Sequence, residues 1–231
     1  MKSVLLYNIY LLKSWKSISE ELLNNVPQDD IYVHLSFDLR YSYRILLAYL
    51  FLLKYKKVRK IFVTPNDAAY GEALGFAKFK SQINFDQYNI LTYIHSKGVS
   101  KPNNKFGKDW RAYMKYFVMD RFDLTLKAFT KGYGLYGCNL HVLTEEQKAN
   151  GRKYAYLYSD FWYAGTFVSA NLDVIRDAFD KAKVEKEFYA VEGFWGKLCE
   201  LKLAFCPHNT PYSLYENPYP RELYVNNYTN P

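Results

Sequence analysis

Short runs of branched and aromatic residues alternate with segments of helical periodicity through the first hundred residues, and this alternation constrains the fold more than any other feature. The pattern predicts strands at residues 4–10, 31–37, 60–64 and 88–94, and helices at residues 15–25, 43–57 and 72–79. Strands joined through helices lie parallel and need a helix layer on each face of their sheet. We therefore expect an α/β fold with a mostly parallel central sheet and helices on both faces.

The second half of the chain continues the same pattern less regularly. Helices are predicted at residues 110–129, 171–183 and 187–203, and strand-containing segments at 133–140 and 154–168. Residues 144–151 are predicted to form a surface loop or a short helix, and the proline-containing tail from residue 207 to wrap the surface as an extended segment. At 231 residues the chain is near the upper end of what one core supports, so we expect one domain.

The composition excludes several classes of protein. A hydrophobic fraction of 49% and an aromatic fraction of 19% are too high for a disordered chain. The net charge of +8 favours an anionic partner, which can be nucleic acid, a phosphorylated small molecule or an anionic membrane surface. The three cysteines show no C-x-x-C spacing, so neither a disulfide framework nor a zinc site is predicted, and a reducing, cytoplasmic location fits best.

No membrane-spanning segment is expected. The amino terminus lacks a small-residue cleavage site and reads as a first buried strand rather than a signal peptide. The longest apolar run, residues 45–53, is nine residues long, against the roughly 20 that a bilayer crossing needs. Peripheral contact with a membrane remains compatible with the sequence.

A candidate binding segment follows the strand predicted at residues 88–94. The common phosphate-binding and zinc-protease motifs are absent from the sequence. Ligands of open α/β sheets bind beyond the carboxyl ends of strands, where this chain places His95, Ser96, Lys97 and Gly98. A lysine there can set its ammonium against a diphosphate, and the glycine lets the backbone approach closely. The alternative is a solvated turn with an incidental lysine.

Residues 93–100 resemble the Tyr-[Ile/Leu]-His-Thr-Lys-Gly-Val-Ser motif of a family of GT-A-type glycosyltransferases found in bacterial surface-polysaccharide loci and large algal (chlorella) viruses. Further similarities follow in the family's order along nearly the whole chain. They are an opening strand at residues 7–10 with Trp15, the acidic Glu72 before a helix, a Trp-x-x-x-Met-x-Tyr-Phe helix at 110–117, Gly-Cys-Asn at 137–139, an aromatic signature at 158–164 and an Ala-Glu-x-Trp element at 190–195.

The resemblance implies a single GT-A-like (Rossmann-like) domain that transfers a sugar from a nucleotide-sugar donor, UDP-sugar favoured, to a hydroxyl of a glycan or glycolipid acceptor. It implies a nucleotide-binding half at residues 1–100, an acceptor and catalytic half at 101–206, and the tail at 207–231. The donor residues would be Tyr10, His95, Ser96, Lys97, Gly98 and Arg111, and the acceptor wall Asn139, Trp162 and Tyr163.

Two acids are candidates for the catalytic base, Asp160 and Glu192. The alternatives are a turn or cap acid for Asp160, a helix-surface acid for Glu192, and a solvated helix face for Arg111. The family's Gly-Asn in the aromatic signature is compressed here to Ser159 and Asp160, which places an aspartate where asparagine is usual.

Metal dependence stays open at the level of the sequence. GT-A enzymes commonly hold Mn²⁺ or Mg²⁺ on the donor diphosphate with an Asp-x-Asp pair, and no clear pair follows any predicted strand. Lys97 and His95 lie where that pair would be expected, so a cationic side chain can take its place. A non-catalytic carbohydrate- or nucleotide-binding module is the alternative function. RNA binding is a weaker one, because the aromatic residues fall mostly in apolar runs, and no nucleic-acid partner is expected.

Overall fold

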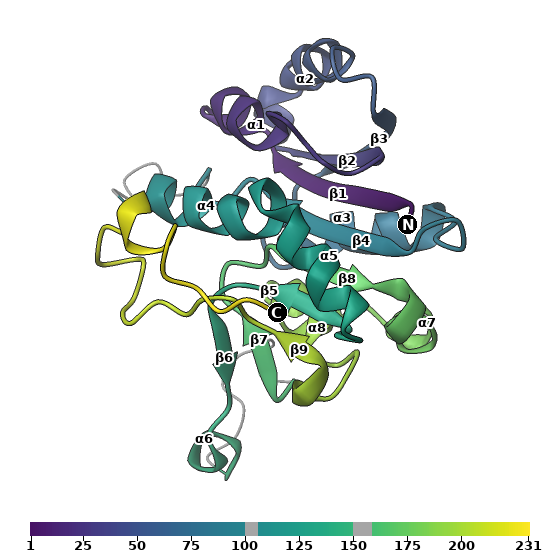
Figure 1. Ribbon diagram of the computed structural model, residues 1–231. Helices are drawn as coiled ribbons and strands as arrows, with labels where there is room; N and C mark the ends of the chain where they lie inside the picture. The colour runs from purple at the N-terminus through teal and green to yellow at the C-terminus, as the bar shows by residue number, and fades with distance from the viewer. Residues whose placement is uncertain (100–105, 150–158) are drawn as a thin grey trace.

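The computed structural model describes residues 1–99, 106–149 and 159–231. Ser100 of the motif at 93–100 and Tyr158 of the aromatic signature at 158–164 therefore lie outside the described residues. Seven strands form one sheet in the order β3-β2-β1-β4-β8-β5-β9 (Figure 1). They are β1 (Ser3–Tyr10), β2 (Asp30–Phe37), β3 (Val58–Pro65), β4 (Ile90–His95), β5 (Leu135–Gly137), β8 (Val168–Asn171) and β9 (Ala204–Phe205). All neighbours are parallel except β8, which is antiparallel to β4 and β5. The predicted α/β fold with a mostly parallel sheet is confirmed.

Helices cover both faces of this sheet because its central strands are apolar on both sides. In β1, Leu5, Tyr7 and Ile9 enter one core cluster, while Val4 and Leu6 enter the other. The first face packs against α1 (Trp15–Leu23), α2 (Arg44–Leu52), α4 (Gly107–Lys115) and α5 (Phe122–Thr130). The second packs against α3 (Ala73–Gln82), α7 (Leu172–Lys181) and α8 (Ala190–Trp195).

The order of the parallel strands creates a crevice between β1 and β4. The chain moves outward from β1 to β2 and β3, and then returns to place β4 on the other side of β1. The connections that follow β1 and β4 therefore leave the sheet in opposite directions. Open α/β sheets bind ligands at such a reversal of strand order, beyond the carboxyl ends of the strands. The two strands end together, since Asn8 of β1 lies opposite His95 of β4.

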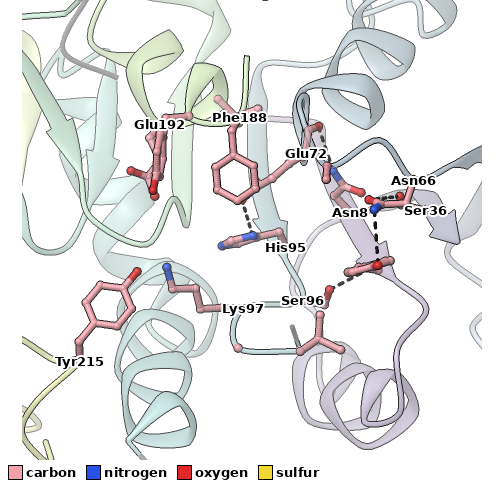
Figure 2. Close-up of a pocket in the computed structure, with 17 residues that line it drawn as sticks. Asn8, Ser36, Asn66, Glu72, His95, Ser96, Lys97, Phe188, Glu192 and Tyr215 are labelled. Atoms are coloured by element: carbon pink, nitrogen blue, oxygen red, sulfur yellow. Dashed lines mark hydrogen bonds and ion pairs between the residues drawn. The ribbon is translucent and has the colours of Figure 1, made fainter. Parts of the chain in front are cut away.

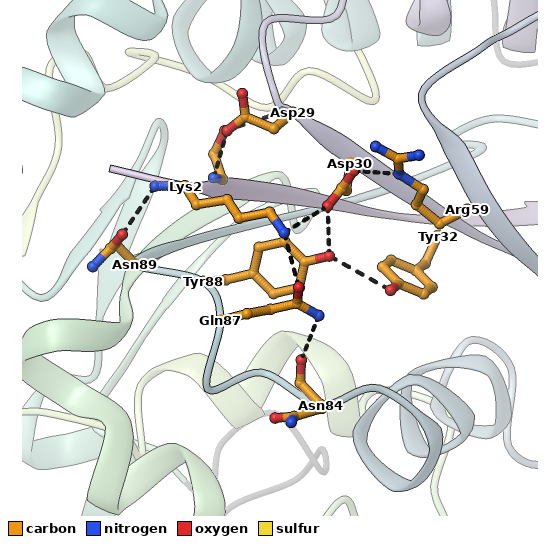
Figure 3. A network of polar contacts seen from close by, with 10 residues as sticks. Lys2, Asp29, Asp30, Tyr32, Arg59, Asn84, Gln87, Tyr88 and Asn89 are labelled. Atoms are coloured by element: carbon orange, nitrogen blue, oxygen red, sulfur yellow. Dashed lines mark hydrogen bonds and ion pairs between the residues drawn. The ribbon is translucent and has the colours of Figure 1, made fainter.

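The amino end of the same sheet is closed by a polar network around Asp30 (Figure 3). Its carboxylate accepts a hydrogen bond of 2.8 Å from the Tyr88 hydroxyl and ion-pairs with Lys2 and Arg59. Although burial raises the pKa of Asp30, the hydrogen bonds from Arg59, Tyr88 and Lys2 outweigh burial and hold the pKa below its usual value. The Asp30 carboxylate therefore has a structural role.

The second half of the chain departs from the sequence prediction at two helices. The helix expected at residues 110–129 is interrupted by a π-helical turn, η2 (Tyr116–Asp120), and by Arg121, whose backbone leaves the helical region (φ −103°, ψ 46°). The helix expected at 187–203 shortens to α8 followed by η4 (Leu201–Leu203). Gly196 lies directly after α8, where any side chain would be excluded because a Cβ would lie 2.0 Å from the Phe161 carbonyl oxygen.

The remaining elements are short. A two-stranded antiparallel ribbon joins β6 (Leu140–Val142) and β7 (Phe161–Tyr163), and α6 (Glu145–Ala149) follows β6. Single turns form η1 (Leu39–Tyr41) and η5 (Arg221–Leu223). The tail after residue 207 packs across α4, where the Tyr219 amide donates to the Asp109 carboxylate at 3.2 Å. Among the described residues, none of the helices combines the length and apolar character that a bilayer crossing requires.

Candidate functional site

A pocket of about 410 Å³ lies in the crevice beyond the carboxyl ends of β1 and β4 (Figure 2). Five parts of the chain line it: the ends of β1 and β2, the segment between β3 and α3, the β4 end with the loop after it, the segment around α8, and the tail. The residues used below are Asn8, Tyr10, Ser36, Asn66, Glu72, His95, Ser96, Lys97, Gly98, Glu192 and Tyr215. The predicted strand-end segment at 95–98 therefore lies in a pocket.

The loop after β4 is a tight turn fixed to β1. The Ser96 amide donates to the Asn8 carbonyl at 2.9 Å, and the Ser96 hydroxyl accepts the Tyr10 amide at 3.0 Å. Gly98 has φ +85°, a left-handed conformation that side-chain-bearing residues rarely adopt. Ser96 and Gly98 thus set the path of the backbone on either side of Lys97.

The Lys97 side chain lies between two aromatic rings at the mouth of the pocket. Its ammonium is 4.1 Å from the Trp110 ring centroid and 5.5 Å from that of Tyr215. Figure 2 shows this ammonium and the Glu192 carboxylate directed into the same space. The lysine is therefore held at a point where it can meet an anion.

His95 is bonded at both ring nitrogens. Nδ1 lies 2.6 Å from Oε1 of Glu72, and Nε2 lies 2.9 Å from the Gly165 carbonyl oxygen. The Tyr93 hydroxyl donates to the other oxygen of Glu72 at 2.6 Å. Burial raises the pKa of Glu72, but the charge of His95 and these hydrogen bonds outweigh burial and hold the pKa below its usual value.

Glu192, on the first turn of α8, has the opposite electrostatics. Burial raises the pKa of its carboxyl, and the negative charge of Glu72 adds to this effect, against the lowering effect of Lys97 and His95. A carboxylate with a raised pKa accepts a proton more readily near neutral pH. The pKa values of the two acids of the pocket are therefore shifted in opposite directions. Glu72 is held ionised beside His95, and Glu192 is suited to take a proton.

A polar wall on the β1–β2 side completes the pocket. Asn8 donates to the Glu72 carbonyl at 3.1 Å and accepts from Nδ1 of His34, whose Nε2 in turn bonds the Thr64 hydroxyl. Asn66 bonds the Ser36 hydroxyl at 3.2 Å and the Tyr10 hydroxyl at 3.4 Å. Sequence reasoning missed Asn8, Ser36 and Asn66, although each lies at or just beyond the carboxyl end of a predicted strand, which is the signal that identified His95.

A second pocket, of about 620 Å³, adjoins the first and shares Tyr189, Glu192 and Tyr215 with it. The ribbon β6–β7 supplies one wall, where the His141 and Trp162 rings are stacked with centroids 5.3 Å apart and planes at 15°. Asn139 lines it too, with a left-handed backbone (φ +58°), and accepts the Thr210 hydroxyl at 2.9 Å. Glu192 thus faces both pockets.

Three predicted site residues are not brought to these pockets. Asp160 is exposed just before β7 and lines neither pocket. Tyr163 is buried, because side chains alternate along β7 and only Trp162 faces outward; its hydroxyl donates to the Phe205 carbonyl. Arg111 is also buried and lines neither pocket, so the predicted direct contact with phosphate is not supported.

Arg111 instead holds the Lys97 loop in place. Its guanidinium pairs with Glu21 at 2.8 Å and donates to the Lys97 carbonyl oxygen at 3.0 Å. Because a planar guanidinium has several donors in fixed directions, it can tie α1 and the loop together. Arg111 is a positioning residue for Lys97.

The pocket does not offer a metal site built from protein ligands. Within the described ranges, no three His, Cys, Asp or Glu side chains converge as metal ligands. Glu72 and His95 lie together in the pocket, but they are bonded to each other. These side chains do not by themselves form a site for a divalent ion, and metal dependence stays as open as the sequence left it.

The sequence matches no family model and no curated protein. Among solved structures, the chain is similar to HddC from Yersinia pseudotuberculosis, with 15% sequence identity and a TM-score of 0.26. The similarity covers 42% of this chain and spans 48% of that one. A likeness this limited says nothing about activity.

Proposed function

We propose that the protein is a glycosyltransferase that moves a sugar from a nucleoside diphosphate donor, UDP-sugar favoured, to a hydroxyl acceptor in surface-glycan or polysaccharide synthesis. One observation carries the proposal: Lys97 and Glu192, from distant parts of the chain, face one space at the junction of two adjoining pockets. A transferase between two substrates needs a cation for the leaving group and a base for the acceptor. The similarity of the motif at residues 93–100 to the GT-A-type family supports the same function.

The first pocket suits the donor. Its β1–β2 wall carries amide and hydroxyl groups that can hydrogen-bond a nucleoside, from Asn8, Ser36 and Asn66. The Lys97 ammonium, with the half-buried backbone at Gly98, meets the diphosphate. His95, held by its contacts with the Glu72 carboxylate and the Gly165 carbonyl, lies beside it. In this proposal Lys97 supplies the counter-charge for the leaving diphosphate.

The second pocket suits the acceptor, because the stacked His141 and Trp162 rings offer an apolar face of the kind that sugar rings contact. In the transfer step the acceptor oxygen forms a bond to the donor carbon, and the bond from that carbon to the diphosphate oxygen breaks. The acceptor proton passes to the Glu192 carboxylate, and the nucleoside diphosphate leaves with its electron pair, stabilised by Lys97. Atoms and charge balance without another reactant.

Thermal unfolding with millimolar UDP or GDP, each with and without Mn²⁺, tests the donor half. A ligand at about ten times its Kd stabilises by about 1.4 kcal/mol, or about 3–6 °C for a chain of this size. We expect Lys97→Ala to remove most of this shift and Lys181→Ala, on the exposed end of α7, to keep it. An unchanged melting temperature under all four conditions would overturn the proposal.

Turnover separates the transferase from a binding module on the same fold. Donor hydrolysis or transfer, followed by release of the nucleoside diphosphate over a panel of sugar acceptors, supports the enzyme. Binding of UDP or GDP without release over the whole panel favours the non-catalytic module.

A further inference from the structure

The segment of residues 39–53 exposes an unusual amount of apolar surface. Helix α2 buries Ala48, Phe51 and Leu52, whereas Leu46 remains 63% exposed and Leu50 54%. We call the exposed large side chains of this segment the apolar face: Leu39, Tyr43, Leu46, Leu47, Tyr49, Leu50 and Leu53. Seven of the 17 large apolar side chains exposed among the described residues fall in this segment, and such a concentration marks a binding surface.

The spacing of the apolar face places its members together. Positions 43, 46, 47 and 50 recur at helical intervals, so their side chains project from one side of α2. Position 54 continues the same stripe one turn beyond Leu50 and carries an exposed lysine. Apolar side chains and a cation therefore share one side of the helix.

The charge around the apolar face has one sign. Residues 39–60 contain seven lysines and arginines and no acid. Arg40 and Arg59 pair with Asp38 and Asp30 at the edges of this segment. Lys54, Lys56 and Lys60 are exposed, and none of them ion-pairs with an acid in the part of the chain that the structure describes.

We propose that this face binds the surface of an anionic lipid bilayer. Apolar side chains beside lysines enter the headgroup region, where they contact acyl chains while the lysines meet lipid phosphates. A second copy of the chain fits less well, because a two-fold interface would set the lysines of one copy against those of the other. At nine residues, α2 lies on the bilayer and does not cross it.

The face also lies close to the candidate site. Leu39 follows Ser36 of the pocket by three residues. Burial and the charge of Asp38 raise the pKa of Tyr10, another pocket residue, and Arg40 is near enough to oppose that rise in part. Docking through residues 39–53 therefore brings the first pocket close to the lipid headgroups. Membrane binding is inferred from exposed apolar side chains and positive charge alone, so it does not depend on the proposed sugar transfer.

Co-sedimentation of the full chain with vesicles tests it. We expect binding to phosphatidylglycerol–phosphatidylcholine vesicles, little binding to pure phosphatidylcholine, and release at high salt. Lys54→Gln/Lys56→Gln should weaken binding about 25-fold, at roughly fivefold for each basic residue. Leu46→Ser/Leu50→Ser should weaken it by roughly tenfold or more for each leucine.

The matched control is Val174→Ser/Leu223→Ser, which removes two apolar side chains of 43% and 44% exposure elsewhere on the surface and should bind as the unaltered chain does. Far-UV circular dichroism melts confirm that each variant folds. The proposal is overturned if the unaltered chain ignores anionic vesicles or if Leu46→Ser/Leu50→Ser binds them equally well. It is also overturned if light scattering shows a dimer that Leu46→Ser/Leu50→Ser dissociates.

Discussion

The imidazole Nδ1 of His95 lies 2.6 Å from the Glu72 carboxylate, and this contact joins the end of β4 to the start of α3 across the floor of the pocket. The other ring nitrogen faces the Gly165 carbonyl at 2.9 Å. Both partners offer oxygen acceptors, so the two contacts fix the orientation of the imidazole beside Lys97. The Glu72 carboxylate is occupied by His95 and by the Tyr93 hydroxyl, which keeps it from acting as a base.

Glu72→Gln should destabilise the protein at neutral pH by about 2 kcal/mol, the usual worth of hydrogen bonds to a charged group, or about 4–8 °C. The folded-state pKa of Glu72 lies below its ordinary value of 4.5, so its stabilising effect is present above pH 4.5 and is lost as the pH falls through the folded pKa. Melting curves of both proteins from pH 7 downward check this. A gap that stays constant with pH would contradict it.

Glu192→Gln should have the opposite effect on stability while abolishing transfer. The folded-state pKa of Glu192 is raised, so stability is present below pH 4.5 and is lost as the pH rises through the folded pKa. Removing the ionisable group should therefore raise stability at neutral pH by about 1 kcal/mol, as is common at functional sites, or about 2–4 °C. Thermal melts and nucleoside diphosphate release measure the two effects.

Asp160→Asn is the matched control for that experiment, because Asp160 is an exposed acid that lines neither pocket. We expect its transfer rate to stay within about twofold of the unaltered rate. Loss of transfer in Asp160→Asn with activity retained in Glu192→Gln would reverse the assignment of the base.

Trp162→Ala should raise the acceptor KM by roughly tenfold and leave the UDP-induced melting shift intact, since Trp162 lines the second pocket and not the first. Tyr163→Phe should do neither, and should cost about 1 kcal/mol of stability through the lost hydrogen bond to Phe205. Steady-state kinetics over acceptor concentration distinguish these outcomes. A normal acceptor KM in Trp162→Ala would exclude the ring stack as the acceptor wall.

The first half of the fold could be predicted because the central strands β1 and β4 are buried on both faces and are therefore rich in apolar and aromatic residues. The 95–98 segment followed from this, since its location depends only on where a central strand ends. Side chains of a strand alternate between its two sides, so Trp162 and Tyr163 of β7 point in opposite directions. The prediction that both line the acceptor wall overlooked this alternation.

Other features depend on contacts that the sequence does not display. Arg111 sits at a helix start soon after the site loop, but only the packing of α1 reveals that Glu21 holds its guanidinium. β9 contributes two residues, too few for a periodic signal. The need for glycine at position 196 follows from its close approach to the Phe161 carbonyl oxygen. Tertiary contact decides each of these cases.

His34 should make the protein sensitive to mild acid. Burial lowers the pKa of its imidazole to about 4 from the ordinary 6.5. The unfolded chain binds the proton first, so stability is lost as the pH falls from 6.5 to about 4, up to about 3 kcal/mol. Urea unfolding across this range should show a flatter pH dependence in His34→Gln, with a remainder from His208, whose pKa burial also lowers. An equal slope in both proteins would contradict the assignment.

Gly75→Ala tests whether the Asn8–His34 pair beneath the pocket matters for donor binding. A Cβ at residue 75 would lie 2.4 Å from Nδ1 of His34 and 2.7 Å from the Asn8 amide nitrogen, so the pair must move. In a helix, alanine normally gains about 1 kcal/mol over glycine, yet here we expect lower stability and a smaller UDP-induced melting shift. Gly132→Ala is the control: it strains a left-handed backbone with no atom within 4 Å of the new Cβ, and should lower stability while leaving the shift unchanged. If Gly75→Ala binds UDP normally, the hydrogen bonds of Asn8 play no part in recognising the donor.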